Sequence, residues 1–209
     1  MKKVFLKSKR IFDIFLSLVL IFIFSPLMLL ISFVIILESK GGALFKQKRI
    51  GKNKKLFTIY KFRSMYLSDG EYINQYKQAI LSDESDKRIT KVGLILRKTS
   101  LDEIPQLFNI LKGQMSFIGP RPILEEQLDA MEEKYHKRFS LLPGLSGLAQ
   151  VRGRRKLNWL KQLQFDSEYI DKVSLCLDFF IFIKTFLVLF SVKEIYGNES
   201  DNWRNYLKK

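Results

Sequence analysis

Apolar side chains fill nearly every position between residues 11 and 37, and this is the strongest feature of the hydrophobic pattern. Asp13 and the pair Ser25-Pro26 are its main interruptions. The run is too long for the apolar core of a signal peptide and predicts a membrane segment. One straight helix of this length would reach roughly 40 Å and could cross the ~30 Å of membrane hydrocarbon.

The charges on both sides of this run argue against a simple crossing. Lysine and arginine cluster within residues 2–10 and again within residues 40–55. One crossing would export one of these clusters, although short basic flanks tend to stay in the cytoplasm. Pro26 can bend the helix, and the Ser25 hydroxyl can bond a carbonyl that the proline frees. We therefore expect a re-entrant helix that returns to the same face of the membrane, with a proline-kinked transmembrane helix as the alternative.

A basic β-hairpin is expected after the membrane segment. Residues 43–47 and 56–62 have the composition of short strands, and the sequence around Gly51 predicts a turn between them. Residues 40–68 carry nine basic side chains and no acidic one. These bases can bind phosphate through Lys61 and Arg63, or they can hold the chain on an anionic leaflet at ~1 kcal/mol per base.

The second half of the chain predicts amphipathic helices. Apolar residues recur at helical spacing in residues 124–141, which also carry five acidic side chains, and in residues 159–173. Glycine and proline in residues 143–147 end the first of these helices, and residues 150–154 are expected to be extended and basic.

The last apolar stretch, residues 173–192, contains Asp178 and Lys184. Two charges cost ~5 to 7 kcal/mol at the middle of a membrane, which is comparable to the gain from the apolar side chains around them. A spanning helix and a helix packed at the interface therefore both stay open.

These patterns predict an α+β fold that is mostly α. We expect one irregular domain with a helix-break-helix membrane element, a small β-hairpin and interfacial amphipathic helices. The expected division is a basic tail and re-entrant helix in residues 1–39, a cytoplasmic catalytic domain in 40–195, and a C-terminal tail in 196–209.

Composition limits the chemistry. The chain has 209 residues, and its 36 lysines and arginines against 21 acids imply an anionic partner such as phosphorylated substrates, anionic lipid or nucleic acid. The single cysteine, Cys176, lies in an apolar run and is expected to be buried. With one histidine, His136, a zinc site or a histidine-based triad has almost no ligands to draw on. Any metal should therefore be a hard ion bound by oxygen.

Two adjacent acids, Asp102 and Glu103, are the best candidates for catalysis. With Ser100 they match a capping box, in which the serine caps a helix and the glutamate bonds back to it. Pro105 weakens that interpretation because it disfavours a regular helix start. Function and capping are evenly balanced on the residues alone. A carboxylate beside a divalent cation can attack a phosphoryl group, and nearby cations neutralise the departing phosphate. The candidates for those cations are Lys61, Arg97, Arg121 and Arg154, although most single lysines and arginines are only solvated surface charges.

The order of the motifs resembles the bacterial sugar transferase family, the small monotopic polyprenyl-phosphate phosphoglycosyl transferases. The resemblance covers about residues 9–192. It rests on the Ser25-Pro26 break, Phe45-x-Gln47-x-Arg49-x-Gly51, Lys61-Phe-Arg-Ser-Met65, Ser100-Leu-Asp-Glu103, Ser116-Phe-Ile-Gly-Pro-Arg-Pro122, Pro143-Gly-Leu-Ser-Gly147 and Ala149-Gln-Val-Arg-Gly-Arg154. It is closest to the small form, which lacks the additional membrane and regulatory domains of larger members.

This resemblance implies a two-step reaction at the cytoplasmic face of the bacterial inner membrane. Asp102 matches the nucleophile that attacks the β-phosphate of a UDP-sugar and releases UMP. Glu103 matches the magnesium ligand. Undecaprenyl phosphate then takes the phosphosugar, which begins a capsule, exopolysaccharide or glycoconjugate. The remaining matches lie around the substrate. Arg97 matches a phosphate-binding arginine, and the others fall on positions that family members use around the substrate, namely Lys61, Arg121, Pro122, Arg154 and Asp166.

A second hypothesis is a non-enzymatic, basic membrane-bound module that holds anionic lipid or nucleic acid. Aromatic residues interleaved with the bases of residues 40–63 would suit stacking on nucleic acid. The membrane run and the glycine- and proline-rich motifs have no role under this hypothesis, so we favour the transferase and expect no nucleic-acid partner. No sugar is identified by the sequence.

Overall fold

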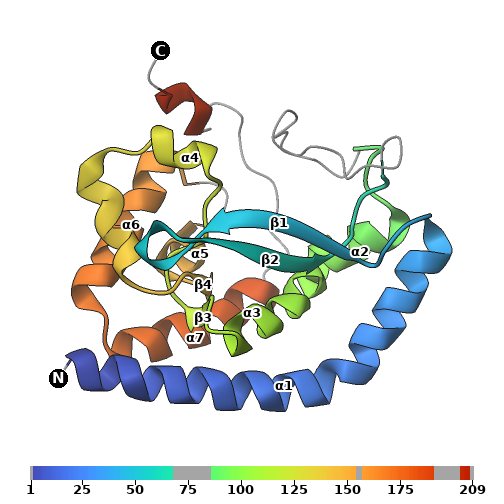
Figure 1. Cartoon of the computed structure of the whole chain (residues 1–209), viewed down its shortest axis with the longest axis horizontal. Helices are drawn as coiled ribbons and strands as arrows, with labels where there is room; N and C mark the ends of the chain where they lie inside the picture. The colour runs from blue at the N-terminus through green and yellow to red at the C-terminus, as the bar shows by residue number, and fades with distance from the viewer. Residues whose placement is uncertain (1, 68–85, 154–156, 191–202, 208–209) are drawn as a thin grey trace.

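The computed structural model describes residues 2–67, 86–153, 157–190 and 203–207. Most of these residues are helical, and within them two small two-stranded sheets lie among the helices (Figure 1). The expectation of a mostly helical fold with one long apolar helix and a small β-hairpin is confirmed.

Helix α1 (Lys2–Glu38) contains the whole apolar run, with Pro26 inside it. The Ser25 hydroxyl donates a hydrogen bond to the carbonyl of Phe22 at 2.8 Å. That carbonyl lies four residues before the proline and therefore lacks its usual amide partner. Figure 1 shows α1 following the edge of the molecule and then turning toward the start of β1. The helix is thus kinked but continuous, and by length and composition it could cross a membrane.

One side of α1 packs on the rest of the molecule, and the other side is exposed. Ile31 and Ile35 are buried, whereas Phe22 on the outer side is 82% exposed. The first half of the helix is also held by polar contacts. Arg10 donates to two carbonyls at the end of α3 (Leu107–Leu111), at 2.7 and 2.9 Å, which satisfies groups that a helix C-terminus leaves open. The outer side leaves a large apolar surface without a protein partner in the described structure.

The predicted hairpin is present. Strand β1 (Leu44–Ile50) pairs antiparallel with β2 (Leu56–Phe62), and a short 3-10 turn, η1 (Lys52–Lys54), connects them. Asn53 and Lys54 in this turn have φ values of 55° and 58°. Lys61 lies near the end of β2, and its side chain contacts Glu103.

A second, parallel pair joins β3 (Ser116–Ile118) to β4 (Gly144–Ser146). Just beyond β3, the backbone at Gly119 lies very close to the backbone at Gly144 in β4. A Cβ atom on Gly144 would lie 2.1 Å from the amide nitrogen of Gly119, so a side chain there would collide with backbone. This close approach of the two backbones fixes the start of the loop that carries Arg121.

The remaining helices surround these sheets. They are α2 (Lys91–Thr99), α5 (Leu148–Gly153), α6 (Trp159–Lys172), α7 (Leu175–Phe190) and the terminal turn η6 (Trp203–Tyr206). Helix α6 confirms the amphipathic pattern of residues 159–173. Residues 150–154 were expected to be extended, which is wrong for 150–153 because they belong to α5. Leu148 and Ala149 at the start of that helix are buried, and their packing outweighs the glycine and arginine that follow.

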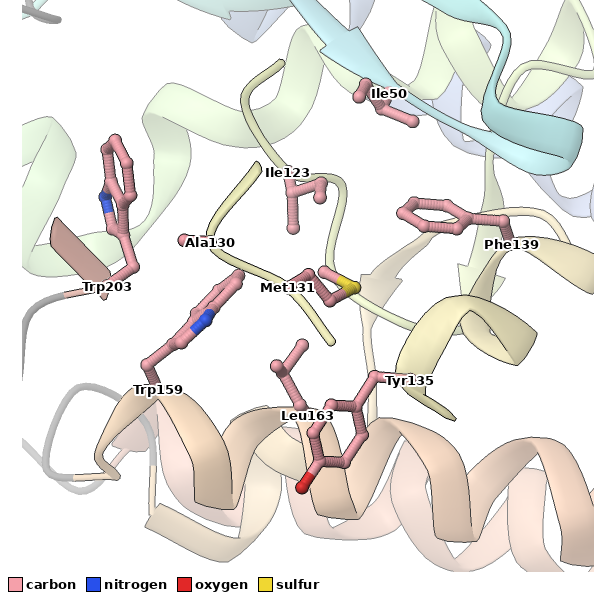
Figure 2. Close-up of a cluster of buried hydrophobic side chains, with 9 residues drawn as sticks. All are labelled: Ile50, Ile123, Ala130, Met131, Tyr135, Phe139, Trp159, Leu163 and Trp203. Atoms are coloured by element: carbon pink, nitrogen blue, oxygen red, sulfur yellow. The ribbon is translucent and has the colours of Figure 1, made fainter. Parts of the chain in front are cut away.

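The periodicity of residues 124–141 predicted one amphipathic helix, and this prediction is wrong. These residues form the short helix α4 (Glu126–Asp129) and a 3-10 segment, η3 (Glu133–Ser140), separated by extended backbone at Glu132. The chain turns there because apolar residues on both sides of the break enter one core cluster (Figure 2). That cluster contains Ile50, Ile123, Ala130, Met131, Tyr135, Phe139, Trp159, Leu163 and Trp203.

The apolar helix α7 packs on the domain along one side only. Ile181 is fully buried, and Asp178 is buried with it, whereas Phe179 is 65% exposed. Cys176 is exposed, so the expectation that it is buried is wrong. Its apolar neighbours indicated burial, but this part of α7 turns its apolar side away from the protein.

Candidate active site

Asp102 and Glu103 lie in an irregular segment between two helices. Helix α2 ends at Ser100, which has a φ of 58°, and the 3-10 turn η2 (Leu101–Gln106) begins directly after it. The Ser100 side chain makes no capping hydrogen bond to η2. The capping box is therefore not formed. Pro105 is accommodated inside this 3-10 turn, and the two carboxylates are left available for other contacts.

Basic side chains from distant segments meet Glu103. Lys61 Nζ lies 2.6 Å from Glu103 Oε1, and Arg121 Nη2 lies 3.5 Å from the same oxygen. The Lys61 and Glu103 side chains are only 20% and 22% exposed, whereas that of Arg121 is 51% exposed. Strand β2 and the loop after β3 thus bring two cations to one carboxylate.

Opposing influences act on Asp102. Burial raises the pKa of its carboxyl group, and the neighbouring charge of Glu103 acts in the same direction. The positive charges of Lys61, Arg97 and Arg121 act against both and lower the pKa. Burial outweighs the cations, so the pKa of Asp102 lies above its ordinary value, and the cations limit that rise in favour of the ionised form that nucleophilic attack requires.

A cavity of about 770 Å³ opens beside this pair. One part of its wall is apolar and includes Leu20 and Phe24 from α1 and Phe182 and Phe186 from α7. Another part is polar and holds Asp102 with its cations. The apolar helices α1 and α7 and the charged centre therefore share one cavity.

A buried ion pair forms a further part of the wall. Arg138 Nη2 lies 2.6 Å from Asp166 Oδ2, and both side chains are 3% exposed. The same nitrogen donates to the carbonyl of Arg121 at 2.7 Å. Burial raises the pKa of Asp166 to about 6 against the opposing charge of Arg138. The Arg138–Asp166 pair thus supports the loop that carries Arg121, whose guanidinium approaches Glu103.

The structure brings together most of the residues that the sequence indicated. These cavity-lining residues are Lys61, Arg97, Asp102, Glu103, Arg121, Pro122 and Asp166. Arg154 lies outside the described residues. Arg63, the other expected phosphate ligand, also lines the cavity, and it donates to the carbonyls of Lys40 and Ser39 at 2.7 and 2.9 Å, just beyond the end of α1.

Arg138 is the residue that sequence reasoning missed. The apolar and acidic positions of residues 124–141 did not single it out. One signal was present, because Tyr135, Arg138 and Phe139 are spaced like a single helical face, and the structure buries all three. A cation at an apolar position of such a face indicates a buried partner.

The acidic pair suits one kind of metal site. Within the described residues no group of three or more histidine, cysteine or acidic side chains could hold a metal ion. Two neighbouring carboxylates are nevertheless enough for Mg²⁺, which keeps several waters and is usually completed by substrate phosphates. The residues therefore fit an ion that binds together with a phosphorylated substrate.

Comparisons with known proteins assign most of the chain to one family. Residues 3–192 match the family described as bacterial sugar transferase. An undecaprenyl-phosphate galactose phosphotransferase of Salmonella typhimurium is 38% identical over 85% of this chain and 39% of its own length. A UDP-glucose:undecaprenyl-phosphate glucose-1-phosphate transferase of Klebsiella pneumoniae is 38% identical over 90% of this chain and 41% of its own.

A smaller relative is covered over most of its length. The exopolysaccharide production protein ExoY of Rhizobium meliloti is 36% identical over 85% of this chain and 83% of its own. The chain thus spans about two fifths of the Salmonella and Klebsiella proteins but matches ExoY nearly end to end. With the family matched over most of the sequence, and with an acidic pair, its cations and two apolar helices around one cavity, the chain belongs to the bacterial sugar transferase family.

Proposed function

We propose that this protein is a phosphoglycosyl transferase that moves a sugar-1-phosphate from a UDP-sugar to undecaprenyl phosphate. The observation that carries the proposal is the shared cavity, which has Asp102, Glu103 and their cations in one part of its wall and apolar side chains of α1 and α7 in another. A nucleotide sugar needs the first environment, and a lipid phosphate needs both. The names of the Salmonella and Klebsiella relatives support the same reaction class.

In the first step, a carboxylate oxygen of Asp102 attacks the β-phosphorus of the donor. The bond between that phosphorus and the oxygen bridging to the α-phosphate breaks, and UMP leaves with the bonding electrons. The product is an acyl phosphate that joins Asp102 to the sugar phosphate. Lys61, Arg97 and Arg121 surround this position and would stabilise the charge that gathers on the phosphates.

In the second step, a phosphate oxygen of the lipid attacks the same phosphorus. The bond to Asp102 breaks, which regenerates the carboxylate and releases the polyprenyl diphosphate sugar. Phe24, Phe182 and Phe186 offer apolar contacts to the lipid chain near its phosphate. Covalent catalysis of this kind divides one difficult transfer between two large substrates into two easier transfers.

Glu103, with Asp102, would hold Mg²⁺. When bound, the ion supplies positive charge that polarises the phosphoryl oxygens. Lys61 keeps Glu103 in place through its 2.6 Å contact, and Arg121, in the loop after β3, approaches the same carboxylate. These contacts orient the acidic pair before substrate arrives.

The membrane arrangement proposed here is monotopic, with α1 re-entrant and the catalytic domain of residues 40–195 on the cytoplasmic face. The kink at Pro26 supports it, as do the basic clusters on both sides of the apolar run. The contacts of Arg10 with α3 support it further, because they hold the start of α1 against the domain. The exposed apolar sides of α1 and α7 would then enter or lie on the lipid.

The reaction would be the first membrane step in making a lipid-linked glycan. The name of ExoY points to exopolysaccharide, and a capsule or another glycoconjugate is the alternative product. The donor sugar is left open, so a panel of UDP-sugars belongs in the first assay.

The test is UMP release by the full-length protein from each UDP-sugar, in the presence of undecaprenyl phosphate and Mg²⁺. We expect release with at least one donor and none above background with Asp102→Asn. Asp129→Asn is the matched control because Asp129 is exposed on α4. Full turnover by Asp102→Asn would contradict the covalent mechanism. Failure of every donor, with lipid or nucleic-acid binding intact, would favour a non-enzymatic module.

A further inference from the structure

Four residues that line the cavity carry buried polar atoms that the proposed chemistry does not use. They are Arg138 from η3, Gln150 from α5, and Trp159 and Asp166 from α6, and we refer to these four residues as the polar lobe. Arg138, Trp159 and Asp166 are 4%, 4% and 2% exposed. The lobe joins the catalytic centre through Arg121, whose carbonyl accepts from Arg138 and whose guanidinium approaches Glu103.

All four side chains of the polar lobe have buried atoms without a hydrogen-bond partner in the described structure. The donors are Trp159 Nε1, Gln150 Nε2, and Nε and Nη1 of Arg138, and the acceptors are Gln150 Oε1 and Asp166 Oδ1. Most buried polar atoms in proteins are paired, because an unpaired one costs about 1–3 kcal/mol. Several such atoms along one cavity therefore indicate a ligand with matching polar groups.

The lobe is also held in shape. Arg138 Nη2 is fixed by Asp166 Oδ2 at 2.6 Å and by the carbonyl of Arg121 at 2.7 Å, which leaves the other guanidinium nitrogens for a ligand. A Cβ atom on Gly147 would lie 2.7 Å from Gln150 Oε1, so the glycine makes room for the Gln150 amide. The indole of Trp159 is packed in the core cluster of Figure 2. Arg138 and Trp159, which are fixed in this way, suit recognition of a rigid ring.

We propose that the polar lobe binds the uracil base of the donor and selects it over other bases. The pairing edge of uracil presents a carbonyl, an N–H and a second carbonyl. The lobe offers the complement, with N–H donors from Trp159, Gln150 and Arg138 for the carbonyls and an acceptor on Asp166 or Gln150 for the imide N–H. Cytosine reverses two of these three groups, so it would leave buried donors and acceptors unpaired.

This inference rests on the proposed function for its choice of a nucleotide, but its test is separate. Binding of UMP, CMP and AMP to the full-length protein is measured by calorimetry, without donor sugar or lipid. All three share the ribose and the phosphate, so differences between them report on the base. We expect UMP to bind at least about 10-fold more tightly than CMP or AMP, because a site built for hydrogen bonds rejects a mismatched ligand.

Two substitutions remove hydrogen bonds from the lobe. Trp159→Phe deletes one N–H while keeping an aromatic ring, and it is expected to weaken UMP binding about 3- to 10-fold. Gln150→Leu deletes a donor and an acceptor and is expected to weaken UMP about 10-fold or more while narrowing the preference over CMP. Trp203→Phe and Gln164→Leu are the matched controls. Trp203 belongs to the same core cluster (Figure 2) without lining the cavity, and Gln164 is exposed on α6.

The outcomes separate this inference from the proposed function. Equal binding of UMP, CMP and AMP would overturn the uracil site even if the enzyme turns over a UDP-sugar, as would Trp159→Phe and Gln150→Leu variants that fold and bind UMP like the controls. Selective UMP binding that both variants weaken would support the site even if no tested sugar were transferred. Melting temperatures close to the controls show that the variants are folded.

Discussion

Replacing Asp178 with asparagine tests how the membrane helix is joined to the domain. Asp178 lies in α7, where one oxygen forms an ion pair with Lys9 of α1 and the other accepts the hydroxyl proton of Tyr169 at 2.8 Å. The Lys9 and Asp178 side chains are only 13% and 10% exposed. The tyrosine hydroxyl also reaches the carbonyl of Ile118, next to the loop that carries the site arginine. The network thus connects α1, α6, α7 and β3.

The size of the effect follows from this burial. Asparagine can still accept the bond from Tyr169, so the main loss is the counter-charge of Lys9. Removing one partner of a buried ion pair costs 3–5 kcal/mol, and a lysine that can shift toward solvent places the expected loss near ~3 kcal/mol. For a protein of this size, that loss lowers the melting temperature by about 6–12 °C.

Thermal unfolding of the full-length protein in one detergent measures this loss. Asp171→Asn is the control, because it breaks a pair with Lys137 whose side chains are 57% and 42% exposed, and such a pair contributes about 0–1 kcal/mol. The double variant Lys9→Met with Asp178→Asn should be more stable than the sum of its single variants predicts, since it leaves no unpaired charge. A melting temperature for Asp178→Asn equal to the control, or strict additivity in the double variant, would refute this reasoning.

Three further predictions concern metal, pH and topology. Chelation with EDTA should abolish UMP release, and added Mg²⁺ should restore it. Glu103→Gln should need more Mg²⁺ than the wild type to reach half of its maximal rate. Unchanged turnover in EDTA would argue against a metal. Burial raises the pKa of Asp166 to about 6 from 3.8. The folded state therefore binds a proton on the Asp166 carboxyl group more tightly than the unfolded state does. Protonated Asp166 contributes roughly 3 kcal/mol at most to the free energy of unfolding, and this contribution is lost as the pH rises from about 4 to about 6. Asp166→Asn cannot titrate at this position, so its melting temperature should rise relative to that of the wild type between pH 4 and pH 7. A difference in melting temperature that does not change with pH would contradict this. Cysteines introduced at Lys3 and Lys52 should label from the same side of the membrane, in a Cys176→Ser background because the native thiol is exposed; labelling from opposite sides would restore the crossing helix.

Local features of the fold could be predicted from the sequence. The hairpin follows from strand composition on both sides of a glycine-containing turn, and the kink in α1 follows from the covalent chemistry of Pro26. Neighbouring acids and an awkwardly placed proline were enough to single out Asp102 and Glu103. Each of these signals lies within a few residues, so no tertiary contact is needed to interpret it.

Features that depend on distant contacts could not be predicted. Asp178 looked like a cost of membrane insertion, but its partner Lys9 lies 169 positions earlier. Residues 124–141 have the period of one helix, yet the shared core of η3, α6 and the hairpin turns the chain at Glu132. Arg138 was not singled out by the sequence because its partner Asp166 comes from another helix. Long-range packing decides such cases, and a single sequence does not reveal it.

The central claim is that Asp102 carries the phosphosugar, and the most direct measurement is the mass of the intact protein. The full-length enzyme is incubated with the UDP-sugar that supports UMP release, with Mg²⁺ and without lipid acceptor, and is then quenched in acid. We predict a mass increase equal to one sugar phosphate, which disappears on addition of undecaprenyl phosphate and never forms in Asp102→Asn. An active enzyme that shows no adduct, or an adduct that persists in Asp102→Asn, would contradict the account.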